Sequence, residues 1–281
     1  MQGVNILVTG ATSQIGIFLL PLLVDQGFNV IALSRAHRED SRGIVWLKGD
    51  LESIDLELFN KMEVHTVIHL AEITLIDNII KVTTTIKRVI AFSSTSALTK
   101  INSNCEADKK LATDLIFGEN LMIDTCVLKS IDFTIFRPTM IYGANVDKNV
   151  AFISKFMSNY GFFPIIGNAE SLRQPVHASD LANACLLAIN EKTTFGKIYN
   201  LVGPETIKYI DMIKKISNSI NKKIILIKVN KFIFILAVTV LRILPQYRHL
   251  SVGMVDRLEQ NLCFDSQDAK IDFNYNPVCF L

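Results

Sequence analysis

Short apolar runs recur along the first half of the chain, and segments with helical spacing separate them. The runs are rich in β-branched residues and nearly continuous in apolar character, which is typical of strands covered on both faces. They occupy residues 5–10, 30–34, 44–48, 66–71, 88–94 and 133–138. Between them, residues 15–26 and 105–122 have the apolar spacing of helices. This alternation predicts an α/β fold with βαβ units and a doubly wound parallel sheet.

The regular alternation weakens after about residue 145. Helix-rich segments separated by Gly and Pro follow, at 152–167, 173–189 and 207–220. We therefore expect the parallel sheet in residues 1–144. A smaller, helix-rich lobe is expected mainly in residues 145–281, partly interleaved with the sheet domain. An apolar strand at 196–203 is expected to return toward this smaller lobe.

One late segment, residues 231–245, is unusually apolar. Its residues 232–241 are followed by Arg242, so the apolar stretch is ten residues long. A helix needs about 20 residues to cross roughly 30 Å of hydrocarbon, so this segment is too short to span a bilayer. We expect a buried or docking helix. The alternative is a helix lying in a membrane surface, with Lys231 and Arg242 extending toward the headgroups.

The composition is that of an ordinary folded protein. Apolar residues make up 49% of the chain, charged residues 20%, and the net charge is +2, which argues against a nucleic-acid binder or a disordered chain. The five cysteines are widely spaced and never form a Cys-x-x-Cys pair, so we expect neither a disulfide framework nor a metal site. The N-terminus lacks the pattern of a signal peptide, and a reducing cytoplasm is the expected compartment.

A glycine-rich turn follows the first predicted strand. The sequence VTGATSQIG, residues 8–16, joins an apolar strand to a helical run, which is the context of a phosphate-binding turn. Gly10 permits the tight turn, and Gly16 lets the helix pack closely on the strand. Ser13 stands where a glycine usually lets the backbone approach the phosphates, but its side chain is small and its hydroxyl can donate to one.

The amide groups at the start of the following helix would meet a pyrophosphate, because the helix dipole favours negative charge there. The turn therefore predicts a Rossmann-type dinucleotide site. An incidental strand–turn–helix junction is the alternative. The residues assigned to the site are Gly10, Thr12, Ser13, Gln14, Ile15 and Gly16.

The end of the second predicted strand bears on the choice of cofactor. An acidic side chain at this position usually binds the free ribose hydroxyls of NAD. Ser34 and Arg35 stand there instead, with His37 and Arg38 close by. A guanidinium suits the 2′-phosphate of NADP, so NADP(H) is favoured over NAD(H). The alternative is a solvated basic turn.

Further motifs follow in a fixed order: TGATSQIG, LKGDLES, VIHLAE, AFSSTSA, IFRPTMIYG, RQPVHASDLA, YNLVGPETI and FNYNP. Each is weak alone, but the ordered set resembles the extended and atypical short-chain dehydrogenases/reductases, the NAD(P)-dependent epimerase/dehydratase group. The resemblance covers nearly the whole chain. It implies a Rossmann-type domain with a smaller C-terminal substrate lobe.

By this resemblance, several further residues are expected to contact the cofactor. Asp50 and Leu51 would contact the adenine, and Leu70 and Ala71 would line the ribose and pyrophosphate. The first serine after the fifth strand, Ser93, would border the nicotinamide. Pro138, at the end of the sixth strand, is also assigned to the cofactor site.

The resemblance also places a substrate region in RQPVHASD. Arg173 and His177 lie where members of the group bind nucleotide-sugar diphosphates and join the two lobes. For His177 a packed, hydrogen-bonded role is favoured over acid–base chemistry. Asp180 has the alternative role of a helix N-cap, because it immediately precedes LANACLLAI.

The chain departs from the group at its proton-transfer pair. Members normally carry Tyr-x-x-x-Lys on the helix after the fifth strand, where the lysine lowers the pKa of the tyrosine. No tyrosine in this chain has a lysine four residues later. Aligning Glu119 with the usual glutamate of the group puts Leu111 and Leu115 at the two catalytic positions, and neither can move a proton. The connection from Ala71 to Arg88 is also short, so the helix within it must be abbreviated.

Other groups would have to take over the proton transfer. Thr95 best matches the Ser or Thr that completes the site in the group, and Ser94 is next to it. Tyr142 is the best substitute for the missing tyrosine, because RPTMIYG ends a strand at the ligand-facing edge. Lys100 and Lys110 are alternatives.

Two functions remain open from the sequence. The first is an NAD(P)-dependent oxidoreductase or epimerase acting on a nucleotide-sugar-type substrate. The second is a non-catalytic, NADP(H)-binding accessory or sensor protein. The candidate partners are the small-molecule substrate, a second copy of the chain in a homodimer and, through residues 231–245, a membrane surface. A nucleic acid is not expected.

Overall fold

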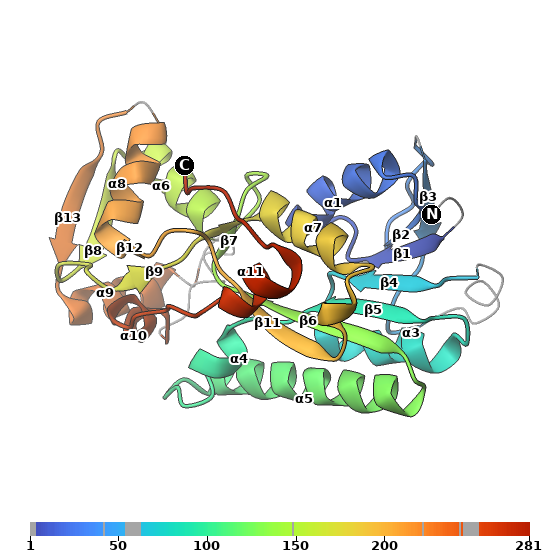
Figure 1. Cartoon of the computed structure of the whole chain (residues 1–281). Helices are drawn as coiled ribbons and strands as arrows, with labels where there is room; N and C mark the ends of the chain where they lie inside the picture. The colour runs from blue at the N-terminus through green and yellow to red at the C-terminus, as the bar shows by residue number, and fades with distance from the viewer. Residues whose placement is uncertain are drawn as a thin grey trace.

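The computed structural model describes residues 4–41, 43–53, 63–147, 149–220, 222–241, 243 and 253–281. Its centre is a seven-stranded parallel sheet of order β11-β6-β5-β4-β1-β2-β3 (Figure 1). The strands are β1 (Asn5–Thr9), β2 (Asn29–Ser34), β3 (Ile44–Lys48), β4 (Thr66–His69), β5 (Arg88–Phe92), β6 (Asp132–Pro138) and β11 (Lys197–Leu201). The predicted α/β fold with a Rossmann-type sheet is confirmed, because all six neighbouring pairs in this sheet run parallel.

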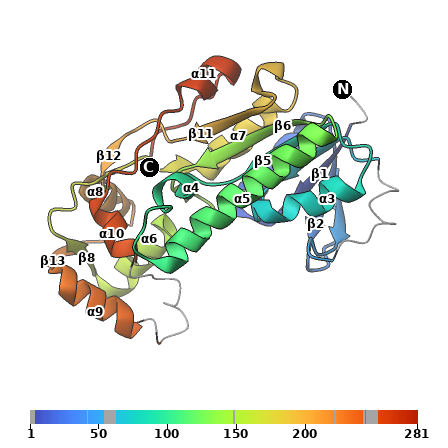
Figure 2. The same cartoon turned by 90° about the horizontal axis from the view of Figure 1, so that it is seen from below.

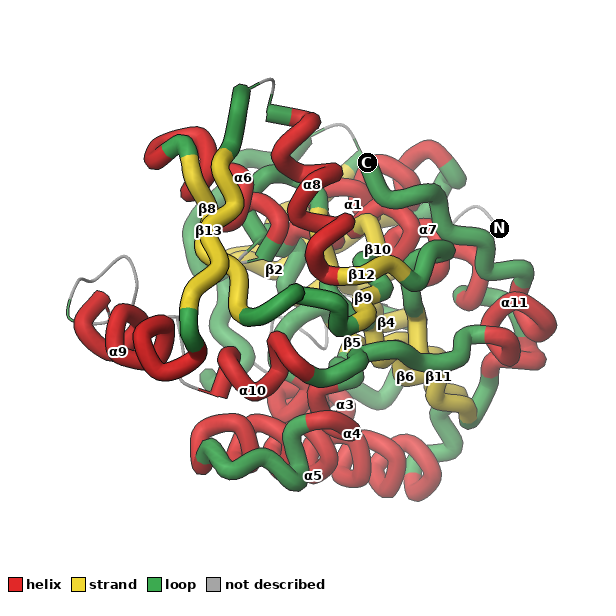
Figure 3. Tube along the Cα trace, turned by 90° about the vertical axis from the view of Figure 1, so that its left-hand side faces the viewer, coloured by secondary structure: helices red, strands yellow, loops and turns green. Residues whose placement is uncertain are grey.

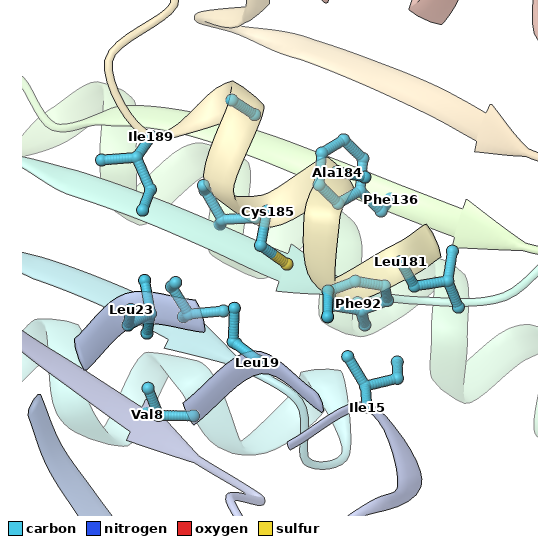
Figure 4. Close-up of a cluster of buried hydrophobic side chains, with 14 of the residues drawn as sticks. Val8, Ile15, Leu19, Leu23, Phe92, Phe136, Leu181, Ala184, Cys185 and Ile189 are labelled. Atoms are coloured by element: carbon cyan, nitrogen blue, oxygen red, sulfur yellow. The ribbon is translucent and has the colours of Figure 1, made fainter. Parts of the chain in front are cut away.

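Helices cover both faces of the sheet, which explains why its inner strands read as continuous apolar runs. One face carries α1 (Gln14–Asp25), α7 (Ala178–Ala188) and α11 (Gln267–Phe273), whose apolar side chains share one core with those of the strands. Figure 4 shows the part of this core between α1, α7 and the strands. The opposite face carries α3 (Ile76–Val82) and α5 (Glu106–Leu128) (Figure 2). The predicted helix at 105–122 therefore continues to Leu128. The abbreviated helix after Ala71 is confirmed: a short η1 (Ile73–Leu75) leads into a seven-residue α3.

The strand predicted at 196–203 does not return toward the smaller lobe, and that expectation is wrong. Its central residues form β11, which pairs in parallel with β6 at the edge of the main sheet. Buried Arg88 accounts for this course. Its guanidinium donates to the carbonyl of Ala188 at 3.0 Å and to the hydroxyls of Thr134 and Thr194 at 2.6 and 3.0 Å. These bonds hold the end of α7 and the following η2 (Lys192–Thr194) against the sheet, so the chain re-enters beside β6.

The second lobe has its own apolar core between helices and short sheets. Its helices are α6 (Val150–Tyr160), α8 (Tyr209–Ser219), α9 (Lys231–Leu241) and α10 (Gly253–Glu259). The short strands are β7 (Ile141–Tyr142), β8 (Phe162–Ile166), β9 (Leu172–Arg173), β10 (Val176–His177), β12 (Ile207–Lys208) and β13 (Ile225–Val229). They pair as β10-β7, β12-β9 and β13-β8. A one-turn helix, α4 (Ser96–Thr99), follows β5.

The apolar segment expected to be a buried or docking helix forms α9, but it is not buried. Of its eleven residues only Val238 is buried. Arg242 and residues 244–245 of the predicted segment lie outside the described residues. Across the described ranges, no helix combines the length and the apolar character needed to cross a membrane.

Candidate functional site

The glycine-rich turn joins β1 to α1 in a tightly packed conformation. Gly10 has a φ of +63°, which glycine adopts freely, and a Cβ on it would lie 2.7 Å from the backbone nitrogen of Ala71. The Ser13 amide donates to the Gly10 carbonyl at 2.9 Å, closing the turn. A Cβ on Gly16 would collide with the carbonyl of Ala11. Both glycines are therefore required by the close approach of the chain to itself.

Ser13 is the N-cap of α1, a role that the sequence interpretation missed. Its hydroxyl oxygen accepts from the Gly16 amide at 3.2 Å, and its backbone is extended. The first amides of a helix have no intrahelical partner. Ser13 takes one of them, so the amides of Gln14 and Ile15 remain for an anion. The Ser13 hydroxyl keeps its own hydrogen, and Thr12 beside it is exposed.

Buried His69 fixes the ends of β1 and β4 next to this turn. Its Nδ1 lies 2.7 Å from the hydroxyl of Thr9, and its Nε2 lies 2.8 Å from the carbonyl of Glu72. A carbonyl only accepts, so Nε2 carries the hydrogen and Nδ1 accepts from Thr9. Burial lowers the pKa of His69 from 6.5 to about 4. The imidazole is therefore neutral near pH 7 and serves as a hydrogen-bonded clamp that holds the adjoining Leu70 and Ala71.

This lowered pKa predicts a loss of stability in mild acid. The unfolded chain takes up the His69 proton near pH 6.5, whereas the folded chain takes it up near pH 4. Between these values the unfolded state binds more protons, so the free energy of unfolding falls as the pH falls, by about 3 kcal/mol over this window. Urea denaturation at a series of pH values should show this slope in the wild type.

In His69→Gln the free energy of unfolding should fall less between these two pH values, by about 3 kcal/mol, because the titrating group is gone. His65→Gln is the matched control, because His65 is exposed one strand-length away. A slope unchanged in His69→Gln, or one that is flattened equally in His65→Gln, would contradict the assignment.

The end of β2 presents the basic residues predicted to select the cofactor. Ser34 is buried and its carbonyl accepts from the Gly49 amide at 3.0 Å, whereas Arg35 is exposed. The Arg38 guanidinium lies over the Trp46 ring, 5.1 Å from its centroid. Arg38 is thus packed on β3, and Arg35 is the cation that directly follows β2.

Asp50 and Leu51 lie at the end of β3, close to Ser34. The Asp50 carboxylate is exposed and accepts from the Glu52 amide at 3.1 Å. Leu51 is buried, and its carbonyl accepts from the side-chain amide of Asn78 on α3 at 2.8 Å. This bond ties the predicted adenine region to the main body of the sheet domain.

Two buried polar atoms close to the strand ends have no hydrogen-bond partner among the described residues. They are Oγ of Ser93, directly after β5, and Oε1 of Gln14, at the start of α1. Buried polar groups are almost always paired, and an unpaired one costs about 1–3 kcal/mol. Both atoms belong to residues assigned to the cofactor. A polar ligand in this region would supply the missing partners, so the residues present fit a bound dinucleotide.

The predicted proton-carrying hydroxyls lie beside Ser93 but have partners within the chain. The Thr95 hydroxyl is buried and donates to the carbonyl of Pro138 at 3.1 Å, and the Thr95 amide donates to the same carbonyl. The Ser94 hydroxyl accepts from the Ser96 amide at 3.1 Å and retains its own hydrogen. Ser94, Thr95 and Pro138 are thus brought together, with Ser94 the less committed of the two hydroxyls.

Tyr142 lies on β7, which pairs with β10, and belongs to the apolar core of the second lobe. Its ring packs edge-on against His177 and Phe280, with centroids 5.0 and 4.8 Å away. Burial raises the pKa of Tyr142 to about 12, so the phenol remains protonated at neutral pH. The phenol is therefore a weak acid, which would give up its proton only to a strongly basic group.

The helix expected to carry the catalytic pair is α5. Leu111 is exposed on it and Leu115 is half-buried. Glu119, one turn further, is buried and pairs with Arg137 of β6, whose Nε donates at 2.8 Å. The alternative lysines are both paired, Lys100 with buried Asp108 at 3.0 Å and Lys110 with Asp114 on the surface.

Arg173 holds the second lobe together rather than lying open to solvent. It is 3% exposed, and its guanidinium donates to the carbonyls of Leu172, Gln260 and Arg257 at 2.6–2.7 Å. It also lies over the Tyr209 ring. Burial lowers the pKa of Arg173. In this arrangement its donors bind the chain segment that ends α10.

Arg257 in turn forms an ion pair with Asp108 of α5. The segment held by Arg173 is therefore also fastened to the sheet domain. Sequence reasoning missed this link, because the partners are separated by 149 positions and neither belongs to a motif.

His177 caps α7, which is the packed role favoured from the sequence. Its Nδ1 accepts from the Ser179 amide at 3.2 Å. A Cβ on Gly143 would lie 2.7 Å from its Nε2, so glycine is needed for this contact. Asp180 does not cap the helix. Its carboxylate accepts from the Val278 amide at 3.2 Å, and burial raises its pKa.

A sequence model of the NAD dependent epimerase/dehydratase family matches residues 6–91 and 84–202. The chain belongs to this family. The matched residues include the glycine-rich turn, both serines after β5 and the cap of α7, whereas the acceptors of Arg173 on Arg257 and Gln260 lie beyond them.

Solved structures confirm that the fold is that of the epimerase/dehydratase family. An epimerase from Methanothermobacter thermautotrophicus has a TM-score of 0.76 at 16% identity, over 99% of this chain and 88% of that one. UDP-glucose 4-epimerase from Thermotoga maritima, solved with UDP-glucose, has a TM-score of 0.70 at 17% identity, over 97% of this chain and 93% of that one. dTDP-glucose 4,6-dehydratase from Bacillus anthracis, solved with NAD, has a TM-score of 0.71 at 14% identity, over 98% of this chain and 92% of that one.

Two curated relatives are similar over a shorter stretch. Both are NADH dehydrogenase (ubiquinone) 1 alpha subcomplex subunit 9, a mitochondrial protein. The Arabidopsis thaliana protein is 37% identical over 73 residues, 26% of this chain and 18% of its own length. The Dictyostelium discoideum protein is 34% identical over 83 residues, which are 28% of this chain and 23% of its own length. The match thus spans less than a quarter of each relative.

Proposed function

We propose that this chain binds NADP(H) and uses it in an oxidoreductase or epimerase reaction on a nucleotide-sugar-type substrate. The observation that carries the proposal is the glycine-rich turn at the start of α1, together with the buried polar atoms near the strand ends. Its two glycines are sterically required, its serine cap leaves two helix amides for an anion, and Ser93 Oγ and Gln14 Oε1 are buried without a partner in the described structure. A bound nicotinamide would exchange hydride with the substrate.

The roles of the remaining cofactor residues follow their positions along the strand ends. Leu70 and Ala71, packed against Gly10, would line the ribose and pyrophosphate. Asp50 and Leu51 would meet the adenine at the far end of the sheet. Ser93 and Pro138 would border the nicotinamide, next to the hydroxyls of Ser94 and Thr95. Ligands of open parallel sheets bind outside these carboxyl ends.

Arg35 is expected to select NADP(H). Its exposed guanidinium directly follows β2, where a 2′-phosphate would lie, and a charge-assisted bond of this kind contributes about 1.5–3 kcal/mol. Arg35→Ala should therefore weaken NADPH binding about tenfold or more and leave NADH binding nearly unchanged, as measured by calorimetry.

Arg38→Ala is the matched control for this prediction, because it removes the same charge from a residue packed on Trp46. If both nicotinamide coenzymes bind equally well to the wild type, or if only Arg38→Ala loses NADPH, the assignment of Arg35 fails.

We assign proton transfer to Ser94 and Tyr142, with Thr95 beside Ser94 as a positioning residue. Ser94 keeps a hydrogen available, whereas Thr95 donates its own to Pro138 and would act by positioning. Tyr142, with a pKa of about 12, would act as an acid. The substrate would lie between these groups and the second lobe, with His177 beside it and with Arg173 acting indirectly, by holding the lobe together. The structure of the similar epimerase solved with UDP-glucose supports the substrate class.

A second candidate is a non-catalytic, dinucleotide-binding accessory protein. Leu111 and Leu115 on α5 cannot transfer protons, and the Arg173 guanidinium is committed to the backbone of the second lobe. The curated relatives are named as subunits of a NADH dehydrogenase, which adds support. In this candidate the bound dinucleotide stabilises the fold or reports on redox state.

Turnover separates the two candidates. Purified protein would be incubated with NADPH or NADH and a panel of UDP- and dTDP-sugars, while the absorbance of the reduced nicotinamide and the sugar products are followed. Steady-state turnover that Ser94→Ala and Thr95→Val reduce supports the enzyme. Tight coenzyme binding without turnover across the panel supports the accessory protein. Mass spectrometry of the ligand that co-purifies would identify the coenzyme independently.

A further inference from the structure

Helix α9 turns an apolar face to solvent at the end of the second lobe. Its exposed positions recur at intervals of one and two turns, so they share one side of the helix. The exposed fractions are 80% for Phe232, 61% for Ile233, 66% for Leu236 and 57% for Val240. Val238 lies on the opposite side, buried against the lobe.

The polar group on this face is already satisfied. Thr239 is the polar side chain among the exposed described positions of α9, and its hydroxyl donates to the carbonyl of Ile235 at 2.8 Å. Within the helix, the backbone amides and carbonyls form hydrogen bonds with one another. This face can therefore leave water without stranding a donor or acceptor, which is the requirement for entering a bilayer surface.

The charge of the surrounding sequence is strongly one-sided. Residues 212–255 contain eight of the chain's 29 basic residues and none of its 27 acidic residues. The remainder of the chain therefore holds 21 basic and 27 acidic residues, a net charge of −6, although the whole chain is nearly neutral at +2. The basic excess is concentrated in the segment that contains α9.

The strand before α9 continues the same composition. On β13, Ile225 and Ile227 are 61% and 44% exposed, and Lys228 directly follows Ile227. β13 and α9 lie together at the end of the molecule farthest from the main sheet (Figures 1 and 3). We call the exposed residues of β13 and α9, with the lysines around them, the α9–β13 surface. Its lysines are Lys222, Lys223, Lys228 and Lys231.

The partners of these lysines leave most of the charge uncompensated. Lys222 donates to the carbonyl of Ser158, and Lys228 donates to the side chain of Asn168, both neutral acceptors. Lys231 pairs with Glu259 at 2.7 Å, at the start of α9. Long lysine stems can extend along apolar groups while the ammonium reaches outward to phosphate.

We propose that the α9–β13 surface binds an anionic lipid bilayer, with α9 lying in the plane of the headgroups. An eleven-residue helix is about 16 Å long, too short to cross the hydrocarbon. A second copy of the chain is a poorer occupant, because a two-fold interface would set this basic surface against itself. Apolar side chains flanked by lysine, on a chain segment without acidic residues, are instead the arrangement of helices that lie on acidic membranes.

Vesicle sedimentation tests the proposal. The full chain would be mixed with vesicles of phosphatidylcholine alone or of equal parts phosphatidylcholine and phosphatidylserine, at low and high salt. The wild type should sediment with the anionic vesicles at low salt, bind much less at high salt and bind weakly to the neutral vesicles. Leu236→Gln should reduce the partition coefficient about tenfold.

Leu128→Gln is the matched control, because it replaces a leucine that is even more exposed than Leu236, 84% against 66%, at the end of α5 in the sheet domain. It should sediment like the wild type, and circular dichroism should show that both variants fold. Three results would overturn the proposal: no sedimentation of the wild type, equal binding to both vesicle types, or equal loss in both variants. A dimer in solution that Leu236→Gln dissociates would show instead that a second copy covers the surface.

Discussion

Gly16→Ala is expected to abolish detectable dinucleotide binding. A Cβ at this position collides with the carbonyl of Ala11, a backbone atom that cannot move without displacing the turn. The helix would have to shift away from β1, carrying the amides of Gln14 and Ile15 with it and breaking the cap bond between Ser13 and Gly16. We expect the affinity for NADPH and NADH to fall at least about a hundredfold, measured by calorimetry, because several phosphate contacts are lost together.

Gly161→Ala is the matched control for this effect. Gly161 has a positive φ, +73°, at the C-cap of α6, but a Cβ there would meet nothing within 4 Å, in contrast to the collision at Gly16. Its replacement should cost about 1–2 kcal/mol of stability and leave coenzyme affinity unchanged. If Gly16→Ala binds either coenzyme as tightly as Gly161→Ala does, α1 does not hold the pyrophosphate.

Glu119→Gln is expected to destabilise the fold by about 3–5 kcal/mol. The Glu119 side chain is 2% exposed and its partner Arg137 is 18% exposed, so the substitution leaves a largely buried guanidinium without its carboxylate. The free energy of unfolding from denaturant titration measures the loss. Glu106→Gln on the same helix removes an exposed carboxylate that pairs with Lys109, and it should cost less than about 1 kcal/mol.

A double variant distinguishes a buried charge from a general packing defect. Replacing Glu119 with Leu and Arg137 with Met removes both charges, and the pair should recover much of the stability that Glu119→Gln loses. A double variant less stable than the single one would mean that the ion pair itself, and not the stranded cation, dominates. Equal losses in Glu119→Gln and Glu106→Gln would refute the burial argument.

The strands of the main sheet could be predicted because burial on both faces leaves a continuous apolar run that any reader of the sequence can see. The glycine-rich turn could also be predicted, because its two glycines, its serine and the start of α1 all lie within residues 8–16. The apolar pattern did not reveal the neighbour of β11, because an apolar strand can pair equally well in the main sheet or in the smaller lobe. That choice depends on Arg88, whose acceptors are distributed from Thr134 to Thr194.

Individual side-chain roles were harder to predict where the partner is remote. The cap formed by Ser13 is local, but its sequence resembles a phosphate donor equally well. The neutral state of His69 depends on complete burial between Thr9 and Glu72, which only the folded chain creates. The commitment of Arg173 to the carbonyls of Arg257 and Gln260 depends on a helix more than eighty positions away.

The position of β11 bears on how the protein is made. During synthesis β6 emerges long before residues 197–201, and until they arrive its outer edge presents unpaired amides and carbonyls. The face later covered by α7 and α11 is also bare at that stage, since both helices come from the second half of the chain. The sheet therefore reaches its full width and cover only when the second half of the chain has been made, so its exposed apolar surface and strand edge favour association with other chains until then.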